Sequence, residues 1–284
     1  AATIDSGDEF ASRQYPVDMR HGRSQKYFVQ RIRRGEITRF PDEIVVEEPL
    51  EIRLDGNLVA TTMRTPGHDY ELAVGFCTTE DLFGGAAVTQ VRYCAEGPAS
   101  DFEYNVVTVD TGGQAPVPQP RLGNVSSSCG LCGSATLTDL ATRLDPIRHP
   151  VIFKAEAIAT VLETIGSQQE LFARTGGLHA AAVFDSEGTL QLIREDIGRH
   201  NAVDKIVGRR VLDDEPTSSH LGLFVSGRAS FEMVQKAWVA GFGTLMAVSA
   251  PSALAIDVAT TANMTLVGFA RSDSMNVYSG QIDQ

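Results

Sequence analysis

The chain has 284 residues, of which 43% are hydrophobic and 21% are charged, so it is long enough for one large core or two smaller domains. Its formal net charge of −12 argues against non-specific binding of nucleic acid, which requires a basic surface. No apolar run approaches the length of a membrane span, and residues 1–12 lack the apolar stretch of a secretory signal. We therefore expect a cytoplasmic protein, whose thiols stay reduced, with neither nucleic acid nor a membrane as its partner.

Strand-like sequence dominates the first half of the chain. Residues 1–30 are polar and glycine-bearing, which predicts a loosely ordered segment. Beyond them, two β-rich runs flank an Asp-Gly turn and predict a hairpin, after which Asp69 is expected to cap a helix. We interpret residues 31–110 as a β-rich N-terminal subdomain. Its predicted strands cover residues 43–54, 58–65, 90–97 and 102–110.

The middle of the chain combines a proline- and glycine-rich run with a pair of cysteines. Residues 111–123, TGGQAPVPQPRLG, offer little to bury and predict a flexible tether. The tether leads into SSSCGLCG, residues 126–133, in which Cys129 and Cys132 form a C-x-x-C pair. We interpret residues 111–135 as a flexible tether and C-x-x-C loop, which carries two mobile thiols.

The second half, residues 136–284, alternates strands and helices. Ser167 and Glu170 are spaced as a capping box for a helix that is expected to end at Gly176-Gly177. The last three strands alternate with two helices, and this βαβαβ order predicts a parallel sheet with crossover helices. The predicted strands cover residues 177–185, 189–197, 221–227, 244–250 and 264–270, and further helices cover 154–165, 199–212, 228–241 and 251–263.

Polar residues follow the last three predicted strands. Ligands bind outside the carboxyl ends of strands in open α/β sheets, where helix N-termini attract anions. Arg228 and Arg271 would clamp a phosphate there, which predicts an anionic ligand such as a nucleotide. Alternatively, Ser226 and Ser252 only cap helices and the arginines form surface ion pairs. The candidate ligand-binding residues are Ser226, Gly227, Arg228, Ser249, Arg271 and Ser272.

Two more polar stretches are candidates for the same site. Arg199 and His200 lie where a strand ends and a helix begins, so His200 is a possible acid or base and Lys205 a possible phosphate ligand. The alternative is a polar helix start with its charges in solvent. The pair Gly176-Gly177 precedes His179 and would fit around a ligand, although His179 also suits a buried core position.

The C-x-x-C pair has three common uses: half of a zinc site, a redox dithiol, or a carrier of sulfur. No second cysteine pair lies at zinc-ligand spacing, and His179 is not followed by the glutamate of a zinc deaminase. A redox dithiol normally opens a helix in a βαβ unit, whereas this pair follows a tether. A mobile pair suits covalent relay of a persulfide sulfur. Cys77 and Cys94 are expected to be buried thiols.

Seven stretches together resemble the FdhD/NarQ family, the sulfurtransferase accessory proteins of formate dehydrogenases. They are RTPGHDYELAVGF, SCGLCG, FARTGGLHAA, EDIGRHNAVDK, SGRASFEMVQKA, AVSAPSALAIDVA and GFAR, and they run in one order from Arg64 to Arg271. One departure lies in residues 77–82, where a glycine usually follows the glutamate; it touches no candidate site residue.

The resemblance implies a specific role. The family takes sulfur from a cysteine desulfurase and delivers it to the molybdenum cofactor, bis-molybdopterin guanine dinucleotide, which it binds for insertion into formate dehydrogenase. Its persulfide-bearing cysteine corresponds to Cys129, with Cys132 as companion, and GDP is the expected analogue of the cofactor. The resemblance also implies a cytidine-deaminase-like mixed sheet without a protein-ligated metal, and a homodimer. The family's cofactor-binding segment corresponds to Phe269, Ala270, Arg271, Ser272, Asp273 and Ser274.

Two other functions stay open from the sequence. In the first, the protein is a non-catalytic chaperone that only holds the molybdenum cofactor. In the second, more remote, it is a zinc hydrolase of the deaminase type. The tether favours sulfur transfer over pure binding, because a chaperone has no need of a mobile thiol.

Overall fold

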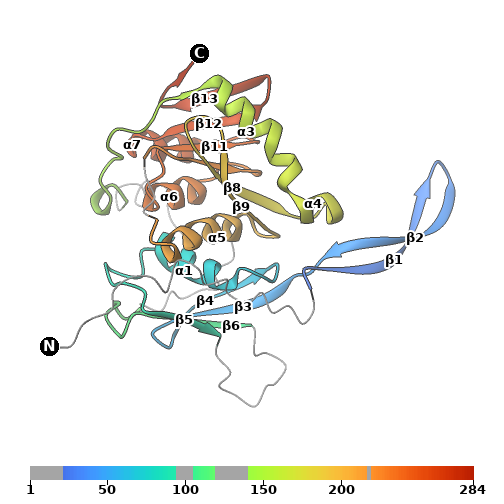
Figure 1. Ribbon diagram of the computed structural model, residues 1–284, viewed down its shortest axis with the longest axis horizontal. Coiled ribbons are helices and arrows are strands. Elements are labelled where there is room, and N and C mark those ends of the chain that lie inside the picture. Colours follow the sequence, from blue (N-terminus) through green and yellow to red (C-terminus); the bar gives the residue numbers. More distant parts are fainter. Residues whose placement is uncertain (1–21, 94–104, 119–139, 216–218) are drawn as a thin grey trace.

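The computed structural model of the chain describes residues 22–93, 105–118, 140–215 and 219–284. Cys129 and Cys132 lie outside these described residues, as do Cys94 and the later part of the predicted tether, residues 119–135. The described residues form two main sheets, of four and six strands, that pack against helices, together with a small two-stranded sheet and a projecting hairpin (Figure 1).

The six-stranded sheet is mixed, and its strand order is β13-β12-β11-β10-β8-β9. Strands β10, β11 and β12 are parallel, which confirms the predicted βαβαβ unit, while β8, β9 and β13 run antiparallel to their neighbours. Helices α6 and α7 are the crossovers between the parallel strands. The strands are β8 (His179–Phe184), β9 (Leu190–Asp196), β10 (Gly222–Val225), β11 (Thr244–Ala247), β12 (Thr265–Arg271) and β13 (Ser274–Ser279), and the helices are α6 (Phe231–Val239) and α7 (Ala253–Thr261).

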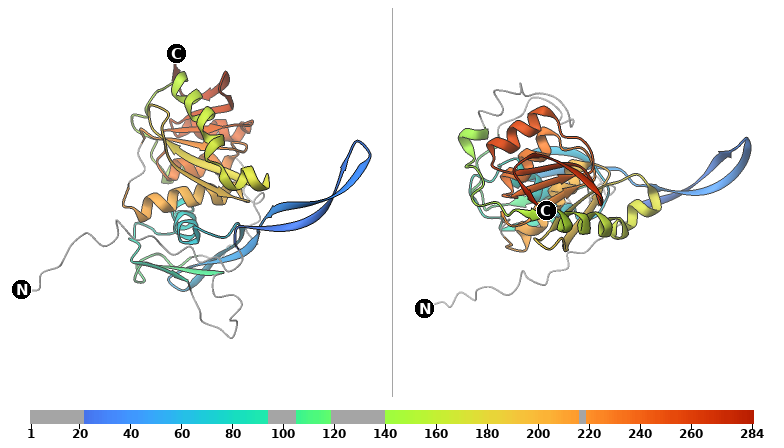
Figure 2. Two further views of the ribbon diagram at one scale, coloured as in Figure 1. Left: turned by 45° about the vertical axis from the view of Figure 1, so that its right-hand side comes forward. Right: turned by 90° about the horizontal axis from the view of Figure 1, so that it is seen from above.

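Helices cover both faces of this sheet (Figures 1 and 2). Side chains alternate between the two faces of a strand, so neighbouring residues enter different cores. Leu223 and Leu245 pack with α5 (Arg199–Leu212), α6 and α7, whereas Phe224 and Met246 pack with α3 (Ala155–Gln168). The strands are therefore buried on both sides, which explains their nearly uninterrupted apolar sequences. At one end, β7 (Phe153–Lys154) pairs with β14 (Ile282–Asp283).

The N-terminal sheet has the strand order β4-β3-β6-β5 and packs against α1 (Asp69–Thr79). Its β3–β4 hairpin confirms the prediction, because Asp55 and Gly56 form the turn with positive φ angles of 47° and 82°. Positive φ suits Gly and Asp in hairpin turns. The strands are β3 (Glu48–Leu54), β4 (Asn57–Arg64), β5 (Gln90–Tyr93) and β6 (Val106–Asp110).

A long hairpin precedes this sheet and projects away from the body of the molecule (Figures 1 and 2). It consists of β1 (Ser24–Arg33) and β2 (Glu36–Val45), which pair only with each other among the described strands. The predicted boundary at residue 30 therefore falls inside a strand, and residues 24–30 are not loosely ordered. The predicted strand over residues 43–54 is likewise divided between β2 and β3. We call the β1–β2 hairpin the arm.

Two predicted helix caps are wrong. His68, in a left-handed conformation, is the N-cap of α1, and the Asp69 carboxylate instead binds the Arg64 guanidinium, with an Arg64 Nη2–Asp69 Oδ2 distance of 2.9 Å. Ser167 does not cap α4 (Glu170–Thr175), because it still belongs to α3 and its hydroxyl donates to the Thr164 carbonyl. In both cases the side chain that was expected to cap the helix forms a hydrogen bond with another group instead. Gly176 does end α4, as expected, with a φ of 68°.

The described part of the predicted tether, residues 111–118, is anchored. Thr111 is fully buried, and its backbone N–H and hydroxyl both donate to the Asp55 carboxylate. The same hydroxyl accepts the N–H of Ala115 at 2.9 Å. The prediction of a flexible segment beginning at residue 111 is therefore wrong for this part, because the β3–β4 turn supplies an acceptor that no local pattern revealed.

Helices α1 and α5 join the two sheets at an unusually close crossing. Gly75 and Gly208 lie at the contact, where a Cβ on either would come within 1.7–1.8 Å of a backbone oxygen of the other helix. Beside the crossing, the buried Asp204 carboxylate accepts hydrogen bonds from Lys236 of α6 at 2.9 and 3.1 Å and from Thr79 of α1 at 2.7 Å. Backbone contact and a paired buried charge thus hold the two halves together.

Candidate functional site

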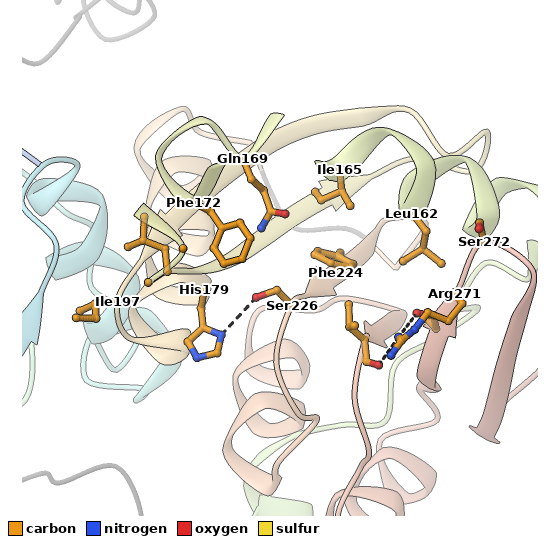
Figure 3. Close-up of a pocket in the computed structure, with 15 residues that line it drawn as sticks. Leu162, Ile165, Gln169, Phe172, His179, Ile197, Phe224, Ser226, Arg271 and Ser272 are labelled. Atoms are coloured by element: carbon orange, nitrogen blue, oxygen red, sulfur yellow. Dashed lines mark hydrogen bonds between the residues drawn. The ribbon is translucent and has the colours of Figure 1, made fainter. Parts of the chain in front are cut away.

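A cavity of about 640 Å³ lies at the carboxyl ends of the parallel strands, beneath α3 and α4 (Figure 3). This is the position at which open α/β sheets bind ligands. Its walls come from the ends of β10, β11 and β12, the start of β8, and the helices above them. The lining residues are Leu162, Ile165, Gln169, Phe172, Gly176, Gly177, Leu178, His179, Ile197, Phe224, Ser226, Val248, Ala270, Arg271 and Ser272.

Backbone hydrogen bonds hold the loops after these strands side by side. The N–H of Ser249 donates to the Gly227 carbonyl at 3.3 Å, and the N–H of Phe269 donates to the Ser249 carbonyl at 3.2 Å. A bridge between Ala229 and Pro251 continues the pairing. The ends of the three parallel strands therefore form one continuous rim.

The Ser226 hydroxyl links this rim to β8. It accepts the backbone N–H of Ala180 at 2.9 Å and lies 3.4 Å from His179 Nδ1 (Figure 3). Burial lowers the pKa of His179, and the positive charge of Arg199 lowers it further, against a smaller effect of Asp196. His179 is therefore neutral near pH 7, with one ring nitrogen to donate a hydrogen bond and the other to accept one. Ser226 does not cap α6, whose N-cap is Ser230.

Arg271 supplies a positive charge at the opposite end of the cavity (Figure 3). Its guanidinium Nη1 donates to the carbonyls of Val248 and Ala270, both at 2.7 Å, and the side chain is exposed. Neutral carbonyls hold the group in place without cancelling its charge. An anion that entered the cavity would therefore meet a positioned cation, and the Ser272 hydroxyl beside it is a further donor.

The segment before Arg271 has a strained backbone. Phe269 has a positive φ of 49° and its side chain is 45% exposed, although aromatic residues rarely adopt this conformation. The register of β12 against β13 shifts between Gly268 and Arg271, so a bulge re-aims the end of β12. Strain of this kind concentrates at ligand-binding sites.

Arg199 and His200 lie beside the cavity and not in its wall. A Cβ on Gly227 would lie 3.4 Å from Arg199 Cδ and 3.6 Å from the His179 ring, so these three residues are neighbours. Within the described residues, Arg199 Nε and His200 Nε2 are buried without a hydrogen-bond partner. Burial, with the charges of Arg199 and Lys236, lowers the pKa of His200 to about 4, so its imidazole is neutral near pH 7.

The structure thus gathers part of the predicted site around one cavity. Its lining contains Gly176, Gly177, His179, Ser226, Ala270, Arg271 and Ser272. Other candidates lie outside the lining: Gly227, Arg228, Ser249, Phe269, Asp273, Ser274, Arg199 and His200. Arg228 follows β10 but is exposed and does not join Arg271 in the cavity wall. The side chains of Gln169, the N-cap of α4, and of Phe172, within α4, also point into the cavity, and the sequence did not predict them (Figure 3).

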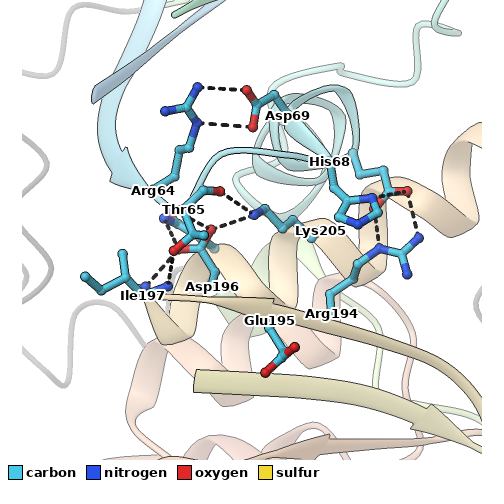
Figure 4. A network of polar contacts seen from close by, with 12 residues as sticks. Arg64, Thr65, His68, Asp69, Arg194, Glu195, Asp196, Ile197 and Lys205 are labelled. Carbon is cyan, nitrogen blue, oxygen red and sulfur yellow. Dashed lines mark hydrogen bonds and ion pairs between the residues drawn. The ribbon is translucent and has the colours of Figure 1, made fainter. Parts of the chain in front are cut away.

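A polar network behind the site corrects both interpretations of Lys205 (Figure 4). Lys205 is fully buried, forms an ion pair with Asp196 at 2.7 Å and donates to the Thr65 carbonyl at 3.0 Å. It is therefore neither a phosphate ligand nor a solvent-facing lysine. Asp196 also accepts the backbone N–H of Thr65 at 3.2 Å, so the network ties the strand end at β9 to the N-terminal half of the chain.

Cys77 is the one cysteine within the described residues, and it is a buried thiol, as predicted. Burial, with the negative charges of Asp204, Asp55 and Glu80, raises its pKa to about 12. The thiolate is the reactive form of cysteine, so Cys77 is unreactive near neutral pH. None of the helices in the described ranges is long and apolar enough to span a bilayer.

The fold and cavity define a mixed α/β protein with a candidate ligand site at the carboxyl ends of its parallel strands. The chain belongs to the FdhD/NarQ family, whose model matches residues 45–283. It is 48% identical over 262 residues to a protein of Streptomyces avermitilis named "Sulfur carrier protein FdhD", with 89% of this chain and 93% of the relative covered. A protein of the same name from Mycobacterium tuberculosis is 46% identical, with 86% and 91% covered.

A solved structure shares the fold. A crystal structure from Desulfotalea psychrophila, described as that of a candidate formate dehydrogenase accessory protein, matches with a TM-score of 0.71. The match covers 90% of this chain and 96% of the other at 21% sequence identity. The mixed α/β fold expected from the sequence is confirmed.

Proposed function

We propose that this protein is a sulfurtransferase for formate dehydrogenase, which carries persulfide sulfur on Cys129 and binds the molybdenum cofactor for insertion. The single observation that carries the proposal is the 48% identity, over 89% of the chain, to a protein named as a sulfur carrier. The proposal includes bis-molybdopterin guanine dinucleotide as the bound substrate, a cysteine desulfurase as sulfur donor, a homodimeric assembly and a cytoplasmic location.

The proposed sulfur chemistry uses both cysteines of the C-x-x-C pair. The Cys129 thiolate attacks the outer sulfur of the desulfurase persulfide, whose sulfur–sulfur bond breaks and whose cysteine leaves as a thiolate. Cys129 then bears the persulfide. In delivery, the Cys132 thiolate attacks the inner sulfur of Cys129, and the outer sulfur leaves as hydrosulfide with the bonding electron pair. The resulting Cys129–Cys132 disulfide is returned to two thiols by a cellular thiol reductant.

The cavity supports the binding half of the proposal. Its volume of about 640 Å³ lies within the ordinary range for small-molecule sites. Arg271 and Ser272 offer charged and neutral donors suited to a phosphate, while Gln169 and Phe172 offer an amide and an aromatic ring suited to a base. A volume and donors of this kind support binding of the guanine nucleotide portion of the cofactor.

Binding of GDP tests the cavity directly. Arg271→Ala is expected to weaken GDP binding about ten- to a hundredfold, because it removes charge-assisted hydrogen bonds to the diphosphate. Isothermal titration calorimetry measures this change. Arg148→Ala is the control, since Arg148 is 83% exposed and pairs with Asp145 away from the cavity. Equal affinities of wild type and Arg271→Ala would exclude this cavity as the diphosphate site.

A further inference from the structure

The arm carries an exposed apolar face. Ile32 and Ile37 are cross-strand partners, and Phe28 lies on the same face of the hairpin. Their side chains are 69%, 65% and 70% exposed, respectively. On the opposite face, Arg31 covers the Phe40 ring at 3.4 Å. On the apolar face itself, Arg39 lies over the Phe28 ring at 5.3 Å, and the three apolar side chains remain mostly exposed. A two-stranded ribbon is only marginally stable on its own, so an exposed apolar face on one indicates a binding surface.

The arm is also basic in an acidic protein. Residues 24–45 carry five Lys or Arg and three Asp or Glu, a net charge of +2, which leaves −14 for the rest of the chain. Four arginines lie toward the tip: Arg31, Arg33, Arg34 and Arg39. Charge complementarity therefore favours a partner surface with acidic residues around an apolar patch.

The base of the arm packs against the wall of the candidate site. Arg174 of α4 forms an ion pair with Glu43 and donates a hydrogen bond to Ser24 at 2.9 Å. A Cβ on Gly177, which lines the cavity, would lie 3.2 Å from Val45. The arm therefore emerges beside α4, the helix that supplies Phe172 to the cavity and has Gln169 as its N-cap. Phe28 and Ile32 lie four and eight residues beyond Ser24, roughly 13 and 26 Å along the strand. A partner that covers them and extends along the arm to its base therefore reaches the cavity.

We propose that the arm binds the acceptor molybdoenzyme. The arm contacts a surface of the acceptor that has acidic residues around an apolar patch, and this contact brings the acceptor to the cofactor cavity. This inference rests on the proposed function, because that function requires an acceptor to receive the bound cofactor. Phe28, Ile32 and Ile37 supply the apolar contact, and the arginines near the tip supply the electrostatic attraction. The acceptor is preferred to a second copy of this chain because the arm is anchored on the cavity wall, where the cofactor is transferred.

Binding to the cofactor-free catalytic subunit of the formate dehydrogenase from the same organism tests this inference. Ile32→Thr/Ile37→Thr removes apolar surface but keeps β-branched residues, which preserve strand propensity. We expect this variant to bind the subunit about tenfold or more weakly in biolayer interferometry, with GDP binding unchanged. We also expect wild-type binding to weaken at high salt. Leu58→Thr/Met63→Thr is the matched control, since these β4 side chains are 57% and 48% exposed, and it should bind like wild type.

The outcomes separate this inference from the proposed function. Equal binding by wild type and Ile32→Thr/Ile37→Thr would overturn the docking role and leave the carrier function intact. A variant that loses binding only because it changes from dimer to monomer, as measured by sedimentation, would overturn it in favour of contact between copies. If the wild-type protein fails to bind the catalytic subunit at all, both the docking role and the proposed delivery to formate dehydrogenase are wrong.

Discussion

Replacing Cys129 by alanine is expected to leave the protein folded and able to bind GDP, yet unable to support maturation of formate dehydrogenase. The expected loss of maturation is complete, because the substitution removes the only atom proposed to hold the transferred sulfur. Formate oxidation by the enzyme matured with each variant measures the effect. GDP titration with the same protein preparations shows whether the cavity is intact.

The other cysteines provide the controls for this experiment. Cys132→Ala should still accept a persulfide but release it poorly, since it lacks the thiol proposed to displace the outer sulfur. Cys77 cannot substitute for Cys129, because it is buried and its pKa is raised to about 12. Full maturation by Cys129→Ala would rule out sulfur transfer through this residue and favour a chaperone that only binds the cofactor.

The second large effect is expected at the crossing of α1 and α5. Gly208→Ala places a methyl group 1.8 Å from the Glu71 carbonyl oxygen, so the two helices must separate. The clashing atom belongs to the backbone of α1, so it cannot move aside by a change of side-chain rotamer. We therefore expect the free energy of unfolding to fall by about 3 kcal/mol or more. Chemical denaturation followed by circular dichroism measures this change.

Gly166→Ala is the matched control for the helix crossing. Gly166 also lies within a helix, α3, but a Cβ there meets no atom within 4 Å. Alanine is the better helix former by about 1 kcal/mol, so this variant should be slightly more stable than wild type. If Gly208→Ala gained stability as well, the close approach of α1 and α5 would be incorrect.

The regular elements were largely predictable because their apolar periodicity is local. Helix α5 begins and ends at the expected residues 199 and 212, and the three parallel strands lie where buried apolar runs alternate with helices. The arm was not predictable in this way. Its strands are exposed on both faces, so they lack the apolar alternation that marks a half-buried strand.

The candidate site was only partly predictable for a different reason. Glycines, serines and arginines at the ends of predicted helices and strands give a local signal, which found Gly176, Ser226 and Arg271. Gln169 and Phe172 have no such signal, because only the tertiary position of α4 turns them toward the cavity. Lys205 was predicted to be exposed or to bind phosphate for the same reason. Its burial depends on the ion pair with Asp196, a partner nine residues away that only the folded chain brings close. The cytidine-deaminase-like description of the sheet stays a prediction.

The most direct test of sulfur transfer is mass spectrometry of the protein after incubation with a cysteine desulfurase and cysteine. Alkylation before digestion traps any persulfide on the cysteine that bears it. We predict one additional sulfur atom on the peptide that contains Cys129 and Cys132, retained in Cys132→Ala, lost in Cys129→Ala, and absent from the peptide that contains Cys77. A wild-type protein that gains no sulfur, or a Cys129→Ala variant that gains as much as wild type, would contradict the account.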